Sequence, residues 1–514
     1  MSNESGREIP KSIYGYGKTT CYAGPFSTIP TGEKVSVRNA CSFPGQQKKL
    51  GSVKEAIQRV NLKDGMAISF HHHLRNGDEV MNLVLNEIAE LGIKNITIHV
   101  SSLSSAHEPL IEHIRNGVVT DISTSGLRGT LGKLQSKENI LGRPVVFRTH
   151  GGRARAIEEG NIKIDVAFIA AACCDDMGNM NGIEGPSAFG AMGYPIVDAQ
   201  YADSVVAITD NLQPFPIWNI SIPMTLVDYV VEVDNIGDSN KIASGATRVT
   251  NNPTDLLIAE NAAKVLIALG CIKNGFSFQA GSGGPSLAVC KFLRSYMEKN
   301  EIVGSFAAGG VTGYLVDMLR DGLFKVLLDT QTFDARAVRS LKENANHVEM
   351  SASMYANPHN KSCTAHQLDV MILSATEIDE SFNLNSITGS TGMIMGALGG
   401  APDTAAGSKI TVVVAPTMRK RIPIVVEKVT NIATPGETID ILVTERGICV
   451  NPRRMELRKK LNETDLEVLS IQELRKNVEK LTGKPEKIKY TDEIVGVIEY
   501  RDGTVLDLIY RVDE

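Results

Sequence analysis

The sequence predicts an α/β protein built from two related halves, each with a mostly parallel sheet flanked by helices. Short β-rich runs alternate with amphipathic helical runs between residues 63 and 209. The same alternation restarts after a polar stretch at residues 235–252. The segments 63–65 (Lys-Asp-Gly) and 273–275 (Lys-Asn-Gly) each precede an apolar run, which is a short internal echo.

The expected elements of the first half alternate between strands and helices. In chain order they are a strand at 66–70, a helix at 79–91 and strands at 95–100, 145–147 and 164–171. The second half repeats the scheme. Its elements are a helix at 254–269, a strand at 276–280, a helix at 286–299 and strands at 302–306, 326–328 and 370–373.

The end of the chain carries a different pattern. Ser470 and Glu473 form an S-x-x-E capping box that predicts a helix to about residue 482. Asp502-Gly503 lies between two β-rich runs and predicts a hairpin. Because an isolated hairpin is only marginally stable, we expect it to pack on the second half or on a partner subunit.

The length of 514 residues is compatible with two to four structural units. The boundaries follow the pattern changes described above. We expect an N-terminal extension over residues 1–60, a first α/β domain over residues 61–250, and a second over residues 251–514 that includes the C-terminal helix and hairpin.

Composition excludes several classes of function. The net charge of −6 and the pI near 6.0, without a basic arm, argue against nucleic acid as a partner. The eight cysteines include no C-x-x-C, which indicates reduced thiols and a cytoplasmic location. The first 18 residues lack an apolar signal core, and no run of about 18 apolar residues occurs, so no membrane partner is expected.

The most informative segment is 276–286, an apolar run that turns into a glycine loop and then a predicted helix. Gly281, Gly283 and Gly284 leave room for backbone N–H groups to surround a ligand oxygen, and Pro285 suits the first turn of a helix. Such a loop can hold a phosphate or a developing oxyanion; the alternative is a tight connection without a ligand. Neither a G-x-G-x-x-G motif with a downstream acid nor a Walker loop is present.

Two further glycine turns follow expected strands of the second half. One contains Gly309 and Gly310, and the other spans residues 389–392. Since the carboxyl ends of parallel strands share one edge of a sheet, the three turns predict one composite site.

Histidines mark the corresponding edge of the first half. His71, His72 and His73 follow the first expected strand, and Arg75 comes soon after. Neighbouring residues on an extended chain point to opposite faces, so we expect no metal here. The interpretations left open are contact with an anionic substrate and a solvated or structural loop.

The segment 148–155 contains three arginines, of which Arg153 is a candidate for binding carboxylates. A solvated helix start is the alternative. The turn at residues 175–179 (Asp-Asp-Met-Gly-Asn) carries two acids, for which we expect a role in capping and turn formation rather than in catalysis.

With these motifs together, the chain resembles the citrate lyase alpha-chain family, within the wider CoA-transferase fold, over nearly its whole length. Residues 278–283 resemble the strand and oxyanion loop of that fold, residues 389–400 its second glycine loop, and residues 443–448 its V-T-E-x-G-I motif. Residues 103–108 and 124–129 resemble the citrate lyase branch in particular. The resemblance implies two CoA-transferase-like halves.

One departure from the resemblance is important for the mechanism. Glutamate-dependent CoA-transferases carry a catalytic Glu in a position where this chain has Ala308, and no carboxylate occurs between Glu301 and Asp317. A covalent glutamyl thioester therefore has no nucleophile at this place.

The resemblance implies a citrate CoA-transferase that converts acetyl-acyl carrier and citrate into citryl-acyl carrier and acetate by direct transfer. The expected partners are the acyl carrier (gamma) subunit, the citryl lyase (beta) subunit and further copies in an oligomer. No cofactor is expected to be held tightly by this chain; the thioester is carried by the phosphoribosyl dephospho-CoA group of the acyl carrier subunit, or by acetyl-CoA. The alternatives are a citramalate or other carboxylate transferase, a sugar-phosphate isomerase, and a scaffold subunit.

The candidate site residues follow from the motifs and the resemblance together. The expected catalytic residues supply or surround oxyanion donors; they are Gly281, Ser282, Gly283, Gly284, Gly309 and Gly310. The expected substrate-binding residues compensate the charge of citrate or approach it closely; they are His71, His72, Arg75, Arg128, Arg153, Gly389, Ser390, Thr391 and Gly392. No metal ligand is expected.

Overall fold

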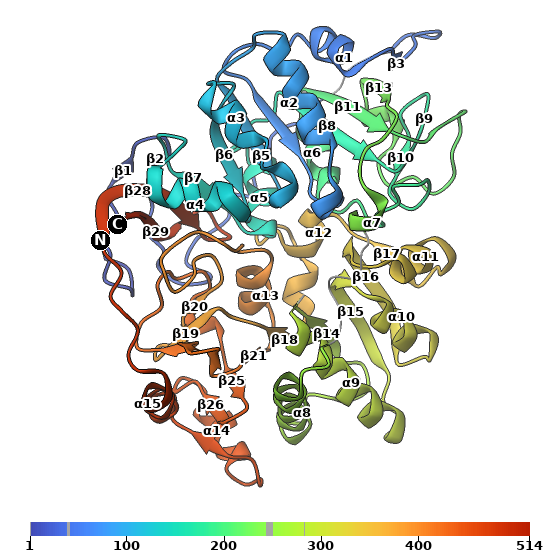
Figure 1. Cartoon of the computed structure of the whole chain (residues 1–514). Coiled ribbons are helices and arrows are strands. Elements are labelled where there is room, and N and C mark those ends of the chain that lie inside the picture. The colour runs from blue at the N-terminus through green and yellow to red at the C-terminus, as the bar shows by residue number, and fades with distance from the viewer. Residues whose placement is uncertain (1, 39–41, 243–249, 282, 514) are drawn as a thin grey trace.

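The computed structural model describes residues 2–38, 42–242, 250–281 and 283–513. Each half contains one large sheet with helices on its faces, as predicted, and the two halves lie one above the other in Figure 1. Buried strands such as β8 (Val166–Ala171) are apolar at every position, which is typical of a parallel sheet covered on both faces.

The first sheet has ten strands. Neighbouring strands run parallel except at one end, where a hairpin forms an antiparallel pair. The spatial order is β29 (Val505–Val512), β28 (Tyr490–Glu499), β7 (Val145–Phe147), β6 (Val119–Thr124), β5 (Ile96–Val100), β4 (Ala67–Phe70), β8, β11 (Ser204–Thr209), β13 (Tyr229–Glu232) and β3 (Lys49–Leu50).

The second sheet has nine strands. Its strands are parallel except for one antiparallel pair, β25 with β26. The spatial order is β17 (His347–Glu349), β16 (Phe324–Thr332), β15 (Gly304–Val311), β14 (Ser277–Ala280), β18 (Val370–Leu373), β21 (Ile410–Val414), β25 (Ile441–Thr444), β26 (Gly447–Val450) and β27 (Val468–Leu469).

The two sheets share one topology over seven strands. In each sheet the strand that follows the repeated segment (63–65 or 273–275), β4 or β14, is central. Three strands that come later in the chain lie on each side of it. Each half also carries a small three-stranded sheet. These are β10 (Met180–Asn181), β9 (Cys173–Asp175) and β12 (Leu212–Gln213) in the first half, and β20 (Leu384–Asn385), β19 (Glu377–Asp379) and β24 (Val425–Val426) in the second. The prediction of two related halves is therefore confirmed.

The turn at residues 175–179 recurs in the second half. Asp175 accepts hydrogen bonds from the backbone and side chain of Asn179, and Asp379 does the same with Asn383. The buried acid therefore organises the turn, as expected for residues 175–179. The shared pattern D-x-x-x-N-x-N is a second internal echo that the sequence analysis missed.

Helices cover both sheets, and many begin at a side-chain cap. Ser52, Thr149, Asn252, Asp334 and Ser470 each accept a backbone hydrogen bond from the first turn that they precede. The helices are α1 (Val53–Arg59), α2 (Val80–Glu90), α3 (Leu110–Arg115), α4 (Gly129–Glu138), α5 (His150–Glu158), α6 (Pro195–Tyr201), α7 (Ser239–Ile242), α8 (Pro253–Ala268), α9 (Gly284–Lys299), α10 (Gly313–Arg320), α11 (Ala335–Glu343), α12 (Ala352–Ala356), α13 (Ala401–Gly407), α14 (Met455–Leu461) and α15 (Ile471–Thr482).

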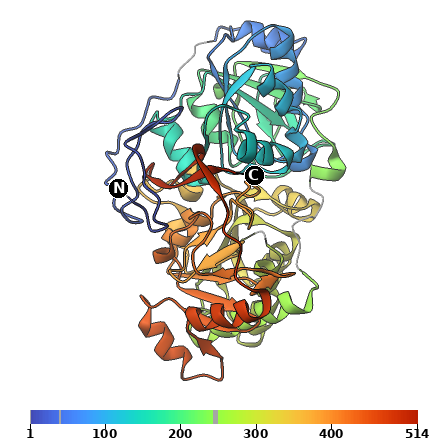
Figure 2. The same cartoon turned by 60° about the vertical axis from the view of Figure 1, so that its left-hand side comes forward.

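The C-terminal hairpin forms where the sequence predicts it and contacts both halves. It packs on the second half, as expected, since Asp507 accepts hydrogen bonds from Asn431 Nδ2 at 3.1 Å and from Ile432 N–H at 2.9 Å. In addition, β28 pairs with β7 and extends the first sheet, which was not expected. The reason is that β7 would otherwise be an open edge, and Val495, Val497 and Ile498 bury apolar side chains there. Figures 1 and 2 both show the hairpin, in dark red, against the first half.

The N-terminal segment runs along the outside of both halves and touches the hairpin (Figure 2). It begins with a short pair, β1 (Ser12–Ile13) and β2 (Gly17–Lys18), and Tyr22 N–H donates to the Val505 carbonyl. Strand β3 then pairs with β13 at the far edge of the first sheet. The first sheet therefore includes chain from before residue 61 and from the C-terminal tail.

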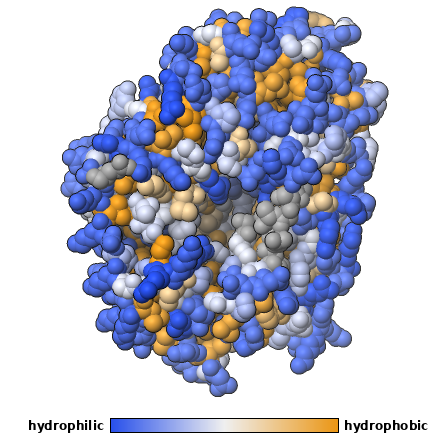
Figure 3. All heavy atoms as spheres, viewed as in Figure 1, coloured by the Kyte–Doolittle hydropathy of each residue, from blue (hydrophilic) through white to orange (hydrophobic). Residues whose placement is uncertain are grey.

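The face of the molecule in Figure 3 is mainly hydrophilic, with apolar patches between the charged side chains. Among the described residues, none of the helices combines the length and the apolar character that a membrane crossing needs.

Candidate active site

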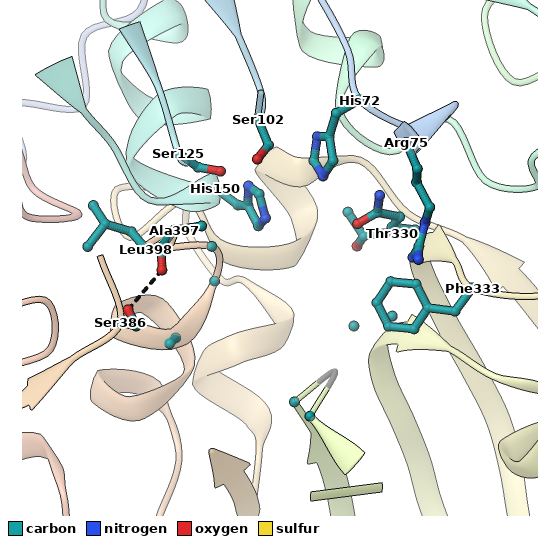
Figure 4. Close-up of a pocket in the computed structure, with 18 of the residues that line it drawn as sticks. His72, Arg75, Ser102, Ser125, His150, Thr330, Phe333, Ser386, Ala397 and Leu398 are labelled. Carbon is teal, nitrogen blue, oxygen red and sulfur yellow. Dashed lines mark hydrogen bonds between the residues drawn. The ribbon is translucent and has the colours of Figure 1, made fainter. Parts of the chain in front are cut away.

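A cavity of about 480 Å³ lies between the two halves (Figure 4). It is lined by residues that follow the carboxyl ends of strands from both sheets. His72 and Arg75 come after β4, Gly281 after β14, and Thr330 lies near the end of β16. The two sheet edges, one from each half, that the sequence predicted separately as binding sites therefore form one site.

The wall from the first half is polar and positively charged. Figure 4 shows His72, Arg75, Ser102, Ser125 and His150 reaching toward the cavity from that side. The charged side chains on this wall are those of Arg75, Arg128 and Lys241. This wall suits an anionic ligand.

Two imidazoles on this wall are neutral. His72 Nδ1 lies 2.6 Å from Ser101 Oγ, and the Tyr194 ring contacts the rings of both His72 and His150 at centroid distances of 4.8 and 4.5 Å. Burial lowers the pKa of His72 well below its ordinary value, and burial together with Arg153 lowers the pKa of His150 to about 3. At neutral pH both rings offer hydrogen bonds without a positive charge.

Arg75 links the two halves across the cavity. Its guanidinium carbon lies 4.3 Å from the centre of the Phe333 ring. Burial lowers the pKa of Arg75 to about 10, so the side chain stays charged at neutral pH. The backbone of Arg75 has φ of +55°, in the left-handed region, which the surrounding structure must hold at some cost.

The wall from the second half is built from glycine turns. Gly281 and Gly283 line the cavity, and Gly283 precedes the first residue of α9. The opening N–H groups of a helix lack partners within the helix, so this end of α9 is suited to an anion. The N–H of Gly281, however, donates to the Ile372 carbonyl at 2.8 Å. Gly281 therefore supplies space but not the oxyanion donor that we expected.

Gly309 and Gly310 lie within β15, at an irregularity in its pairing with β16, and not in the turn that we expected after a shorter strand. A Cβ on Gly309 would lie 2.5 Å from Gln279 Nε2, and one on Gly310 would lie 2.2 Å from the Phe333 ring. Gly309 also has φ of +97°. These glycines let the side chains of Gln279 and Phe333 reach the cavity.

Among the described residues that line the cavity, none is Asp or Glu. Ala308 is buried in an apolar cluster with Met350 and Tyr355 and does not line the cavity. The glutamate-dependent route thus has no carboxylate at position 308 or among the described residues of the cavity lining.

Comparison with known proteins identifies the family. Residues 46–512 match the family model described as citrate lyase, alpha subunit. The chain belongs to the citrate lyase alpha-subunit family. The citrate lyase alpha chain of Haemophilus influenzae is 48% identical over 489 residues, which covers 95% of this chain and 97% of that protein.

Solved structures agree with the assignment to the citrate lyase alpha-subunit family. The citrate lyase alpha subunit of Streptococcus mutans, solved in complex with citrate, is 48% identical, has a TM-score of 0.96, and each chain covers 100% of the other. A Pseudomonas malonate decarboxylase hetero-tetramer, with 15% identity and a TM-score of 0.62 over 86% of this chain and 84% of that one, shares the fold alone. As an alpha subunit of this family, the chain is a CoA-transferase subunit of a citrate lyase complex.

The structure brings some of the predicted site residues together and separates others. Those that line the cavity are His72, Arg75, Arg128, Gly281, Gly283, Gly309 and Gly310. Those that do not are His71, Arg153, Gly284, Gly389, Ser390, Thr391 and Gly392. Ser282 lies outside the described residues.

His71 and Arg153 are bound to other parts of the chain. The His71 ring is buried, with Nε2 3.0 Å from the Ala170 carbonyl and Nδ1 3.0 Å from Nδ1 of His73. Both terminal nitrogens of Arg153 donate to the buried carboxylate of Asp198, at 2.7 and 2.8 Å. A guanidinium that neutralises an internal acid in this way is not available to a substrate carboxylate.

The glycine positions outside the cavity also have structural roles. Gly284 opens α9 beside Thr250. The turn 389–392 faces the C-terminal tail, where a Cβ on Gly392 would lie 2.9 Å from the hydroxyl of Tyr490. The cavity is lined instead by Gly399 and Gly400, at the start of α13.

Several residues of the cavity wall were missed as site residues. They are Gln279, His150, Tyr194, Thr330, Phe333, Tyr355 and Ser374. Gln279 and His150 lie inside motifs that the sequence analysis quoted, and their place directly after or at the end of a strand was the available signal. Thr330 and Phe333 carry no local signal beyond lying near the end of an expected strand.

Asp403 ties two parts of the cavity wall to each other. Its buried carboxylate, in the first turn of α13, accepts hydrogen bonds from Thr149 Oγ1 at 2.8 Å and from Gly151 N–H at 3.0 Å, at the start of α5. Arg501, at the tip of the C-terminal hairpin, is fully buried and donates to the Asp403 carbonyl at 3.0 Å. Burial raises the pKa of the Asp403 carboxyl to about 6, although Arg501 opposes the shift.

We expect Asp403 to lower the stability of the protein as the pH rises from about 4 to about 6. Because the folded-state pKa is above the ordinary value of 3.8, the folded protein binds this proton more tightly than the unfolded chain does. The stabilisation from the protonated Asp403 carboxyl is full below the ordinary pKa and is lost as the pH passes 6. Urea unfolding from pH 4 to 8 should show the free energy of unfolding of the native protein falling relative to that of Asp403→Asn over this interval. Parallel curves would contradict the assignment.

Proposed function

We propose that this chain exchanges the acetyl group of an acyl carrier thioester for citryl, releasing acetate, by direct transfer between the two substrates. The observation that carries the proposal is the composition of the cavity wall. A positively charged face from the first half lies opposite a glycine-rich face from the second, and the described lining residues include no carboxylate. A substrate carboxylate then takes the place of the enzyme carboxylate as the nucleophile.

We assign citrate to the wall of the first half. A trianion needs compensating positive charge, which Arg75 and Arg128 supply, whereas Lys241 forms an ion pair with Asp238 at 2.9 Å. The neutral imidazoles of His72 and His150 add hydrogen bonds without the cost of burying further charge. The relative from Streptococcus mutans that was solved with citrate supports this class of substrate.

We assign the thioester to the wall of the second half. The thioester would arrive on the phosphoribosyl dephospho-CoA group of an acyl carrier subunit, or on acetyl-CoA. The close-packed glycines support the fit, since a Cβ on Gly283 would lie 2.6 Å from Ser374 Oγ and would push side chain into this wall. The start of α9 then faces the thioester carbonyl.

The proposed reaction has two displacements. A citrate carboxylate oxygen bonds to the thioester carbonyl carbon, the carbonyl electrons move onto oxygen, and collapse of this oxyanion expels the thiolate and leaves an acetyl citryl anhydride. The thiolate then attacks the citryl carbonyl, and acetate leaves with the bridging oxygen. No proton is transferred, so the protein contributes proximity and oxyanion stabilisation.

We further propose that the chain works with an acyl carrier (gamma) subunit and a citryl lyase (beta) subunit. The family places it in a multi-subunit citrate lyase complex. A covalently carried thioester must move between the transferase and lyase active sites, which requires a mobile carrier between them.

The fate of one oxygen atom tests direct transfer. With enzyme in excess over acetyl-acyl carrier and with citrate labelled with ¹⁸O in all carboxylates, we expect acetate from the first turnover to carry one labelled oxygen. Transfer through an enzyme carboxylate would give unlabelled acetate in that turnover, and so would hydrolysis by water. The control uses unlabelled citrate in H₂¹⁸O, where we expect unlabelled acetate. Unlabelled acetate from labelled citrate would overturn the proposal.

A further inference from the structure

We propose that the side-chain amide of Gln279 is a catalytic hydrogen-bond donor to the thioester oxyanion, and that Tyr355 positions it. The inference rests on the proposed function, because it assigns a residue to the oxyanion that direct transfer creates. Gln279 is on β14, two positions before Gly281. Its side chain lines the cavity while the residue is only 6% exposed.

The hydrogen bonds of Gln279 leave one end of the amide without a partner. Its Nε2 lies 2.8 Å from the Tyr355 hydroxyl, and its Oε1 is buried with no hydrogen-bond partner within the described part of the chain. A buried amide oxygen without a partner costs about 1–3 kcal/mol, which favours the opposite orientation of the amide or a ligand that approaches it.

A half-turn of the amide resolves the hydrogen bonding. Burial raises the pKa of the Tyr355 phenol, so the hydroxyl keeps its proton and can donate it. With the amide turned, the Tyr355 hydroxyl donates to Oε1. Nε2 then occupies the position that has no partner within the described part of the chain, so its N–H groups are available to a ligand. That end of the amide is then a donor next to the glycine turns.

The surrounding backbone is shaped for these two side chains. A Cβ on Gly309 would lie 2.5 Å from Gln279 Nε2 and 2.6 Å from its Cδ. A Cβ on Gly400 would lie 2.5 Å from the Tyr355 hydroxyl. Both glycines line the cavity. The pair is therefore held at the wall by close contacts from Gly309 within β15 and from Gly400 at the start of α13.

The Gln279 amide would supply the oxyanion donor that the Gly281 backbone does not. The N–H of Gly281 is used within the sheet, so the glycine turns offer fewer donors than the sequence suggests. As the carboxylate adds to the thioester, charge develops on the carbonyl oxygen, and a preorganised N–H gains strength at that moment. The amide transfers no proton; it stabilises the oxyanion in both displacements.

Substitution of Gln279 tests the role. For Gln279→Leu, which keeps the approximate size, we expect kcat to fall roughly 10²- to 10³-fold with little change in KM for citrate, as for loss of one oxyanion donor. Tyr355→Phe keeps the amide but removes its anchor, and we expect a smaller loss, about tenfold. Circular dichroism and thermal unfolding of both variants check that they are folded. A kcat for Gln279→Leu within threefold of the native value, or a loss confined to KM, would overturn the proposal.

A charged variant separates catalysis from packing. In Gln279→Glu the ionised carboxylate opposes the oxyanion, whereas the protonated acid can donate a hydrogen bond. We expect its activity relative to the native enzyme to rise as the pH falls; a constant ratio would overturn the proposal. The ¹⁸O-citrate experiment, repeated on the residual turnover of Gln279→Leu, distinguishes the hypothesis about Gln279 from the hypothesis of direct transfer. If the acetate is labelled and kcat is normal, the role of Gln279 is rejected but direct transfer is retained. If the acetate is unlabelled, direct transfer is rejected.

Discussion

Replacing Gly309 by alanine is expected to lower kcat roughly 10²-fold or more. The added methyl group would lie 2.5 Å from the Gln279 amide, and the backbone φ of +97° is one that alanine rarely adopts. The variant must move the amide, the strand or both, and shifts of this size at an active site have large effects on rate. Steady-state kinetics with acetyl-acyl carrier and citrate measure the loss.

Gly322→Ala is the matched control for backbone strain. Gly322 follows α10 in the same half and has φ of +75°, but a Cβ there would have no atom within 4 Å. We expect this control to lose about 1–2 kcal/mol of stability and to keep its kcat. If Gly309→Ala also kept its kcat, close packing at Gly309 would have no part in the reaction.

Replacing Arg75 by methionine is expected to raise KM for citrate by roughly 10- to 100-fold. Arg75 supplies positive charge to the cavity wall of the first half and keeps it at neutral pH, since its pKa is about 10. A charge-assisted hydrogen bond to a carboxylate is worth about 1.5–3 kcal/mol, which corresponds to that range of affinity. The effect should be larger for citrate than for acetate in the reverse reaction, because citrate carries more charge.

Two further variants bracket the effect of Arg75. Arg75→Lys keeps the charge but not the planar group above Phe333, and we expect an intermediate KM. Arg320→Met removes an exposed arginine from α10, outside the cavity, and should leave KM for citrate unchanged. Equal losses for Arg75→Met and Arg320→Met would mean that only net charge matters.

Local patterns predicted the elements well. The strands and helices of both halves, the helix that begins after Ser470 and the hairpin around residues 502–503 all form. Apolar periodicity, caps and turn residues act over a few positions, so a single segment carries the signal. The hairpin contacts the second half as predicted, but its pairing with β7, about 350 positions earlier in the chain, was not predicted. Nothing local in either segment specifies the other.

The candidate site was predicted in part for a similar reason. Glycine turns and polar residues after strands pointed to the correct edges of both sheets, and His72, Arg75 and Arg128 do line the cavity. Arginines look alike in a sequence, however. Arg153 was chosen on the same grounds as Arg75, but Asp198 lies within reach of Arg153 and holds it inside the first half.

By itself the sequence determined the repeated α/β architecture, the edges of the sheets that carry the site, and the absence of a glutamate at position 308. Only the tertiary structure decided which donors are available. Gly281 uses its N–H within the sheet, whereas the amide of Gln279 lies at the cavity with one end unpaired. The physical reason is that a hydrogen-bonding group serves a ligand only if no other part of the folded chain has already bound it, and that depends on contacts between segments far apart in sequence.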